Sequence, residues 1–240
     1  MHKEFKRLQN KGEKMETEIS SNNKITLCGK ILNKPEITHL LYGEGFYEFM
    51  LGVDRLSDYE DKIPITISEK IFDGNAFGVG DKVLINGQLR SYNKLVEGKS
   101  KLILTVFARD ILMAENEAEM NEIELSGYIC KEPIYRTTPF NREICDMLLA
   151  VNRAYNKSDY LPCIAWGKNA RVVRELRVGE KVLISGRVQS REYQKKLDSG
   201  IFETRVAYEI SVNKLDLEES NLELLQSDHT EDVESRVNKA

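Results

Sequence analysis

Trp166, the only tryptophan of the chain, is followed directly by Gly167 and Lys168. Alternation along the preceding strand-like run places the small residues Cys163 and Ala165 inside and leaves the indole outside. An exposed indole can stack on any nucleic-acid base, because every base has a π-face, and the Lys168 ammonium can then meet the neighbouring phosphate. The segment therefore predicts a stacking platform for a base. The alternative is that Trp166 covers the core against the helix that follows it.

Basic and aromatic residues are interleaved on both sides of this segment. The candidate contacts in this half of the chain are Arg153, Tyr155, Tyr160, Arg187, Arg191, Tyr193, Lys195 and Lys196. From position 187 to position 195, every odd-numbered residue except Gln189 is basic or aromatic, so these side chains share one side of a strand. Each charge alone is typical of a solvated surface, whereas a basic strip beside exposed aromatics is typical of a groove for a single nucleic-acid strand. In the other half of the chain, the candidates are Arg55, Arg90 and Tyr92.

The sequence contains no arrangement of residues that is typical of catalysis or metal binding. It has no glycine-rich phosphate loop, and its histidines, His2, His39 and His229, lie far apart in the sequence. The four cysteines include no C-x-x-C pair and are interpreted as free thiols within strands. We therefore expect no enzymatic activity, no metal and no cofactor.

The elements that must position the candidate residues occur in two copies. Residues 23–31 return at 121–129, an offset of 98, and residues 80–87 return at 179–186, an offset of 99. The longer offset also pairs Thr105, Ala108 and Ile111 with Thr204, Ala207 and Ile210. Solenoid repeats run only ~20–50 residues, so a period of about a hundred residues predicts two tandem domains.

Alternating apolar residues predict five strands in each copy, with a short helix between the third and the fourth. The first copy has strands near 24–31, 46–53, 63–68, 82–89 and 101–111, and a helical segment near 69–76. The second copy has strands near 123–129, 147–151, 161–166, 181–189 and 202–212, and a helix over 169–176. This order is that of the OB-fold, a five-stranded Greek-key barrel, so we expect an all-β protein with two tandem OB-folds. A β-sandwich is the alternative, which the lone helix disfavours.

Composition and charge set the domain boundaries. We expect a flexible tail at 1–22, the first barrel at 23–115, a linker at 116–120, the second barrel at 121–215 and an acidic, disordered tail at 216–240. The net charge is +4 over 121–215 and −1 over 23–115, which makes the second copy the better partner for a polyanion. The chain has no apolar run of the ~20 residues that a membrane span needs, so we expect a cytoplasmic protein with no membrane contact.

The second copy resembles the single-stranded DNA-binding protein family of bacteria and phages over nearly its whole length. The matching segments are Glu122–Ile129, Leu149–Arg153, Trp166–Ala170, Gly179–Gly186 and Arg187–Arg191. The resemblance implies an OB-fold that binds single-stranded DNA. In that family the aromatic residue before Gly-Lys stacks on a base, which corresponds to Trp166, and Arg153 matches the polar end of the family's second strand.

The chain departs from the family pattern in three respects. Members usually carry one barrel per chain and assemble four barrels, so two barrels imply a homodimer here. The first copy has Ser68-Glu69-Lys70 where the second has Trp166-Gly167-Lys168, so its platform is expected to be missing. The acidic tip with an apolar aromatic residue, which docks replication partners in the family, is not found at residues 235–240.

These observations predict sequence-independent binding of single-stranded DNA, mainly through the second copy. Such binding would protect single strands during replication, recombination or repair. The alternative is a primosomal or replication scaffold that uses OB barrels mainly for contacts with other proteins. The residues leave open whether DNA or RNA is preferred.

Overall fold

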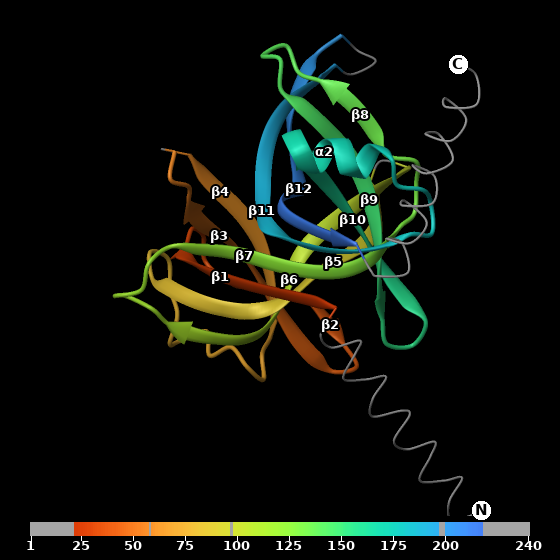
Figure 1. The fold of residues 1–240 in the computed structure, drawn as a ribbon. Helices are drawn as coiled ribbons and strands as arrows, with labels where there is room; N and C mark the ends of the chain where they lie inside the picture. The colour runs from red at the N-terminus through yellow and green to blue at the C-terminus, as the bar shows by residue number, and fades with distance from the viewer. Residues whose placement is uncertain (1–21, 58, 97, 197–199, 218–240) are drawn as a thin grey trace, which may run out of the picture.

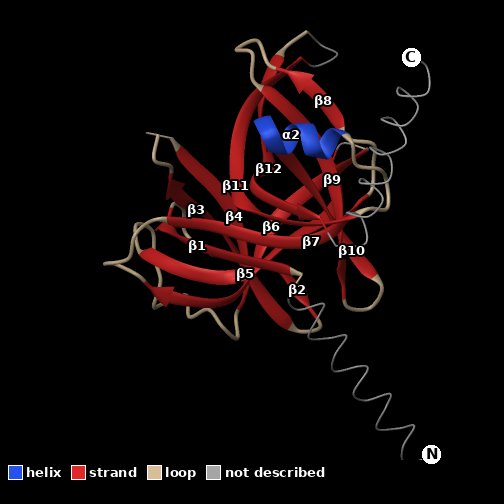
Figure 2. Cartoon of the chain, viewed as in Figure 1, coloured by secondary structure: helices blue, strands red, loops and turns tan. Residues whose placement is uncertain are grey.

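The computed structural model describes residues 22–57, 59–96, 98–196 and 200–217. The expected tails at 1–22 and 216–240 therefore lie almost entirely outside the described residues. The described part consists of a sheet of 12 strands and the helix α2 (Figure 2). Within it, no helix is long and apolar enough to cross a membrane.

The first copy folds into a closed barrel. Its strands are β1 (Asn23–Ile31), β2 (Glu36–Leu41), β3 (Glu44–Asp54), β4 (Glu60–Ser68), β5 (Lys82–Val96) and β6 (Lys99–Met113). Strand β1 pairs with both β3 and β5, and β4 runs parallel to β6, which closes the ring β1-β3-β4-β6-β5. Strand β2 pairs only with β3, on the outside of this ring.

The second copy repeats this topology. Its elements are β7 (Met120–Ile129), β8 (Ile134–Thr137), β9 (Glu143–Arg153), β10 (Lys157–Trp166), α2 (Gly167–Arg174), β11 (Lys181–Lys196) and β12 (Phe202–Leu217). Strand β7 pairs with both β9 and β11, and β10 runs parallel to β12. The predicted pair of OB-folds is confirmed, with one additional edge strand in each barrel.

One glycine lies where each barrel closes. A side chain at Gly29 would place a Cβ 2.2 Å from the carbonyl oxygen of Gly52 on β3, and one at Gly127 would place it 2.9 Å from that of Ala150 on β9. Real Cβ atoms do not approach so closely, so only glycine allows the first strand of each copy to reach the strand that closes its ring.

The two barrels share one continuous sheet. Strands β1 and β7 pair antiparallel, from Asn23 opposite Leu125 to Cys28 opposite Met120. Figure 1 shows these strands side by side between the red-to-yellow first barrel and the green-to-blue second barrel. The tandem copies are therefore direct neighbours, as their short linker predicts.

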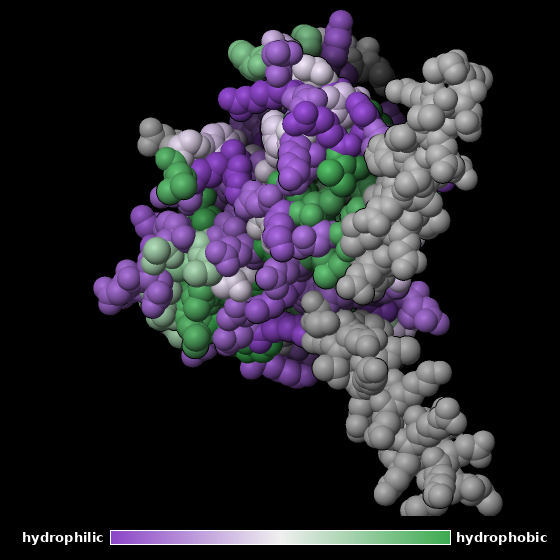
Figure 3. Space-filling model, viewed as in Figure 1, coloured by the Kyte–Doolittle hydropathy of each residue, from purple (hydrophilic) through white to green (hydrophobic). Residues whose placement is uncertain are grey.

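The surface seen in Figure 3 is mainly hydrophilic, with apolar residues gathered beneath α2 and toward the lower left of the view.

The prediction of a helical segment near 69–76 is wrong, because these residues form a series of turns. The amide of Phe72 donates to the carbonyl of Ser68 over 3.0 Å, which makes a single helical turn. The turn ends at Asp73-Gly74-Asn75, where Asp73 Oδ1 accepts a hydrogen bond of 2.9 Å from the amide of Asn75. Such a turn competes with helix continuation, which explains why only the second barrel keeps a helix at this point.

The pairing of the last strands differs from the predicted 99-residue offset. Val106 lies opposite Ile65 of β4, whereas Ile210 lies opposite Cys163 of β10, so β6 and β12 correspond with an offset of 104. The predicted pairs Thr105–Thr204, Ala108–Ala207 and Ile111–Ile210 are therefore wrong by five positions. The offset changes between β11, which corresponds to β5 with an offset of 99, and β12. The five additional residues therefore lie within the β11–β12 hairpin, which is longer than the β5–β6 hairpin.

Candidate nucleic-acid interface

The outer face of the second barrel carries the predicted platform. Cys163 and Ala165 are buried at 3% and 0% exposure, whereas Trp166 is 36% exposed, as the alternation along β10 predicts for these three residues. Ile164, on the same side of the strand as Trp166, is also buried, at 5%. The indole Nε1 donates a hydrogen bond of 3.1 Å to Ser211 Oγ on β12. This bond holds the ring against β12 and leaves part of it open to solvent.

The glycine between Trp166 and Lys168 is required by the backbone conformation at this turn. Gly167 has a φ of 50°, in the left-handed region that favours glycine. This conformation lets β10 pass directly into α2 without a connecting loop. Lys168 is thereby held at the start of α2 with an exposed side chain.

Strand β11 presents the predicted basic strip. Its odd positions lie opposite residues of β12, with Arg191 opposite Ala207 and Tyr193 opposite Arg205. The guanidinium of Arg191 lies 5.9 Å from the centre of the Tyr193 ring. The Arg191 side chain is 58% exposed, and its Nε is 3.8 Å from Glu209 Oε1. An exposed ion pair this long contributes little, so Arg191 can exchange Glu209 for another anion at low cost.

The other exposed candidates of the second barrel surround this strip. Tyr160 is 47% exposed on β10, Tyr155 is 93% exposed in the β9–β10 turn, and Tyr193 is 37% exposed. Lys195 and Lys196 are exposed at the end of β11, next to residues 197–199, which lie outside the described residues. We define the open group on the second barrel by its exposed residues on β10, α2 and β11, which are Trp166, Lys168, Tyr160, Arg191, Tyr193, Lys195 and Lys196.

Four predicted arginine contacts lie elsewhere, at the junctions between the barrels. At the first junction, Arg90 Nη1 donates to Asp159 Oδ2 over 2.9 Å, and Arg153 Nη1 lies 3.6 Å from Asp159 Oδ1. The same Oδ1 accepts a hydrogen bond of 2.8 Å from the amide of Ser91. Asp159 has no exposed side-chain surface, so this carboxylate is buried between Arg153 of its own barrel and two residues of the first barrel, Arg90 and Ser91.

The second junction contains the same kinds of groups with the roles of the two barrels exchanged. Arg55 Nε donates to Asp61 Oδ2 over 2.7 Å, and Arg187 Nη1 donates to the same oxygen over 3.0 Å. Asp61 Oδ1 accepts a hydrogen bond of 2.8 Å from the amide of Ser190. Asp61 is 1% exposed, so each barrel inserts one buried aspartate against an arginine and a serine amide of the other.

At each junction, one buried aspartate faces two arginines. Burial lowers the pKa of Arg90 and of Arg187, and the hydrogen bonds to Asp159 and Asp61 oppose this effect. The pKa of Arg55 is raised, chiefly by its hydrogen bond to Asp61. Because guanidinium groups stay charged in proteins, each aspartate faces two positive charges. Sequence reasoning could not foresee this role, since each aspartate meets partners more than 60 residues away.

The first barrel lacks the platform at the expected position but holds aromatic side chains nearby. Ser68 is 5% exposed and its hydroxyl donates to a carboxylate oxygen of Glu44. The His39 ring stacks on Phe46 at 5.1 Å between centroids, and Phe46 lies 5.8 Å from Phe107. Phe107 occupies on β6 the position that Ser211 occupies on β12. The 99-residue offset concealed this correspondence.

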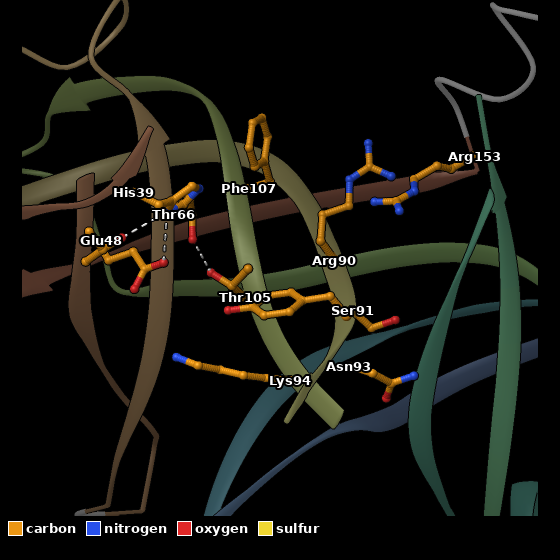
Figure 4. A pocket seen from close by; sticks show the side chains of 12 residues that line it. His39, Glu48, Thr66, Arg90, Ser91, Asn93, Lys94, Thr105, Phe107 and Arg153 are labelled. Carbon is orange, nitrogen blue, oxygen red and sulfur yellow. Dashed lines mark hydrogen bonds and ion pairs between the residues drawn. The ribbon is translucent and has the colours of Figure 1, made fainter. Parts of the chain in front are cut away.

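A pocket of about 650 Å³ lies beside these rings (Figure 4). The residues that line it include Phe107, His39, Tyr92, Arg90 and Lys94 of the first barrel and Arg153 of the second. The structure therefore places Arg90, Tyr92 and Arg153 around this pocket, apart from the open group on the second barrel. Burial raises the pKa of the Tyr92 hydroxyl. Among the described residues, no cluster of His, Cys, Asp or Glu could hold a metal ion.

Comparison with known proteins points to one family. The model of the single-strand binding protein family matches residues 120–218, which contain the second barrel. The chain is 33% identical over 111 residues to single-stranded DNA-binding protein 2 of Listeria monocytogenes, and this match covers 43% of the chain and 69% of that protein. It is 30% identical over 97 residues to single-stranded DNA-binding protein A of Bacillus subtilis, covering 38% of the chain and 56% of that protein.

A solved structure extends the likeness to both barrels. The wild-type single-stranded DNA binding protein from Thermus aquaticus has a TM-score of 0.61 and 21% identity, covering 82% of this chain and 92% of that chain. At this identity the likeness shows the fold, and its coverage is too large for one barrel alone. The Bacillus match, in contrast, leaves nearly half of that relative outside the compared region.

Proposed function

The chain belongs to the single-strand binding protein family, and we propose that it binds single-stranded DNA without sequence preference, mainly through the outer face of the second barrel. The observation that carries this proposal is Trp166, partly exposed and followed by the exposed Lys168 on the segment that the family matches. A base stacked on such a ring contributes roughly 1–3 kcal/mol.

The phosphates of the bound strand then follow β11. Arg191 and Lys195 project from the same side of this strand as Tyr193, so cations and a second ring alternate along one line. Stacking accepts every base and phosphate contacts carry no sequence information, which accounts for binding without sequence preference. We propose that this binding protects single strands during replication, recombination or repair in the cytoplasm, with single-stranded RNA as the competing ligand.

Anisotropy titrations with labelled single-stranded DNA, single-stranded RNA and duplex DNA test this function. We expect tighter binding to the single strand than to the duplex, and an affinity that falls with salt by a logarithmic slope of about 0.7 per phosphate contacted. Equal affinity for duplex, or an affinity independent of salt, would contradict the proposal. A folded protein that binds none of these ligands would instead favour the scaffold function.

We further propose that two chains associate, which yields the four barrels that the family usually assembles. Apolar residues follow one line of strand pairs across the continuous sheet, where Leu112 pairs with Leu84, Leu84 with Cys28, and Cys28 with Met120. Cys28 is buried within the single chain, whereas Met120 is 36% exposed. Leu112 is 53% exposed in the single chain, so a second copy could cover it. Light scattering should give twice the chain mass of 27.6 kDa, and Leu112→Glu should shift it to the single mass. A monomeric parent protein would contradict this assembly.

A further inference from the structure

The aromatic and the small residue have exchanged strands between the two barrels. In the second barrel, the aromatic Trp166 on β10 contacts the small Ser211 on β12. In the first barrel, the small residue is Ser68 on β4, and the aromatic is Phe107 on β6. Phe107 lies 5.8 Å from Phe46, the residue that pairs with Ser68. The first barrel therefore has an aromatic ring in the same part of its outer face, supplied by the neighbouring strand.

The pocket beside Phe107 has the size and the lining that a nucleotide requires. Its volume of about 650 Å³ is within the ~300–1,000 Å³ range of small-molecule sites. Phe107 and Tyr92 line it together with three cationic side chains and one carboxylate, which are Arg90, Lys94, Arg153 and Glu48. Rings that can stack on a base and guanidinium groups that can bind a phosphate thus face one space.

Arg153 has unused hydrogen-bonding capacity at this pocket. Its Nε is buried and has no hydrogen-bond partner, and its Nη1 is 3.6 Å from an Asp159 oxygen that already accepts from Ser91. Arg90 makes the shorter contact with Asp159, at 2.9 Å. Two guanidinium groups therefore share one carboxylate, which leaves positive charge at the edge of the pocket for a phosphate oxygen.

The junction at Asp61 does not offer the same site. The pocket at Asp61 is smaller, about 410 Å³, and none of the described residues that line it is aromatic. Asp54 and Asp61 line it together with Arg55 and Arg187, so acidic and basic groups balance there. Of the two junctions, only the one at Asp159 thus combines aromatic rings with an excess of cationic side chains.

Strand β10 connects this junction with the platform of the second barrel. The amide of Tyr160 donates a hydrogen bond of 2.7 Å to Ser91 Oγ, next to the buried Asp159. Tyr160 and Trp166 lie on the same outer side of β10, six residues apart, which spans about 20 Å. The exposed Tyr160 ring therefore lies between the pocket and the indole.

We propose that the bound single strand continues from Trp166 along β10 into this pocket, where a base stacks on Phe107 and a phosphate contacts Arg90 and Arg153. This inference rests on the proposed function. It makes the first barrel a second binding site instead of a purely structural unit, and it places the crossing of the strand at the Asp159 junction. The ligand is a single-stranded oligonucleotide long enough to cover both barrels.

Phe107→Leu tests the inference, because leucine keeps the apolar contact with Phe46 but has no π-face. For oligo(dT) long enough to cover both barrels, we expect affinity to fall about 5- to 150-fold, which corresponds to the ~1–3 kcal/mol of one stacked base. Phe107→Tyr keeps the ring and should retain the affinity of the parent protein. An oligo(dT) too short to span both barrels should quench Trp166 equally in all three proteins.

The outcomes separate this inference from the proposed function. If the parent protein binds no single strand, the proposed function fails; if it binds and Phe107→Leu binds every length equally well, only the strand path fails. A cross-link made in the parent protein keeps the test independent of variant folding. Oligo(dT) that contains 5-iodouracil should photo-cross-link to the peptide with Phe107 as well as to the peptide with Trp166. Cross-links confined to the second barrel would overturn the inference.

Discussion

The two barrels share a topology and a junction chemistry but differ in what their outer faces present. Each barrel inserts one buried aspartate against an arginine and a serine amide of the other. The arginine of the same barrel differs, because Arg55 donates to Asp61 over 2.7 Å, whereas Arg153 lies 3.6 Å from Asp159. On the faces, in contrast, Trp166 lies at the end of β10 in the second barrel, whereas Phe107 lies on β6, the last strand of the first barrel. The repeated fold thus fixes how the barrels join and leaves the binding face free to diverge.

A residue that occurs at equivalent positions in both barrels need not be a DNA contact, as Arg55 and Arg153 show. Arg55 and Arg153 occupy equivalent positions, which on the sequence alone supports a common role in binding DNA. In the structure, both lie beside the buried aspartate of their own barrel. Equivalent positions in the two copies therefore point first to the interface that the copies form with each other.

The largest expected effect concerns these junctions. Asp159→Ala and Asp61→Ala each leave two guanidinium groups without their buried carboxylate, so each should lower the free energy of unfolding by about 3–5 kcal/mol. Urea unfolding measures this loss. Asp146→Ala is the matched control, because it removes an exposed partner of Arg136 and should cost less than about 1 kcal/mol. Junction variants as stable as this control would show that the barrels are held mainly by the β1–β7 pairing.

The sequence predicted the barrels because their cores follow a period of two. Residues such as Leu161 and Cys163 alternate with outer residues along each core strand. Strand β2 was missed because all six of its residues are exposed and no alternation marks it. Phe107 was missed because the longer β11–β12 hairpin shifts the last strand by five positions. The buried ion pairs were missed because the spacing of charges along the chain does not reveal contacts between domains.

The next effect compares the two equivalent positions on the faces. Trp166→Ala should weaken single-strand binding by about 1–3 kcal/mol. Because the ring is 36% exposed, its removal should destabilise the fold by less than the roughly 3–5 kcal/mol of a core aromatic. Ser68→Ala, at the equivalent position of the first barrel, should leave affinity unchanged. Affinity and melting temperature, measured on both variants, distinguish a loss of binding from a loss of folding. If the affinity of Trp166→Ala falls only in proportion to its folded fraction, the indole is a core residue and not a binding residue.

The smallest effect separates a face arginine from a junction arginine on β11. Arg191→Ala should reduce the slope of log affinity against log salt by about 0.7, the value of one phosphate contact, without lowering the melting temperature. Arg187→Ala should lower the melting temperature because it leaves Asp61 with fewer partners. Salt titrations and thermal unfolding of both variants test this division. The reverse pattern would move the binding strip from the open face to the junction.

The central claim, that a single strand stacks on the second barrel, is tested most directly by the fluorescence of the parent protein. Trp166 is the only tryptophan, so its emission reports on this one position without any substitution. Titration with oligo(dT) should quench the emission to saturation, at the same concentrations at which anisotropy shows binding, and added salt should reverse the quenching. Binding seen by anisotropy with an unchanged Trp166 emission would contradict the account, because the strand would then occupy another surface.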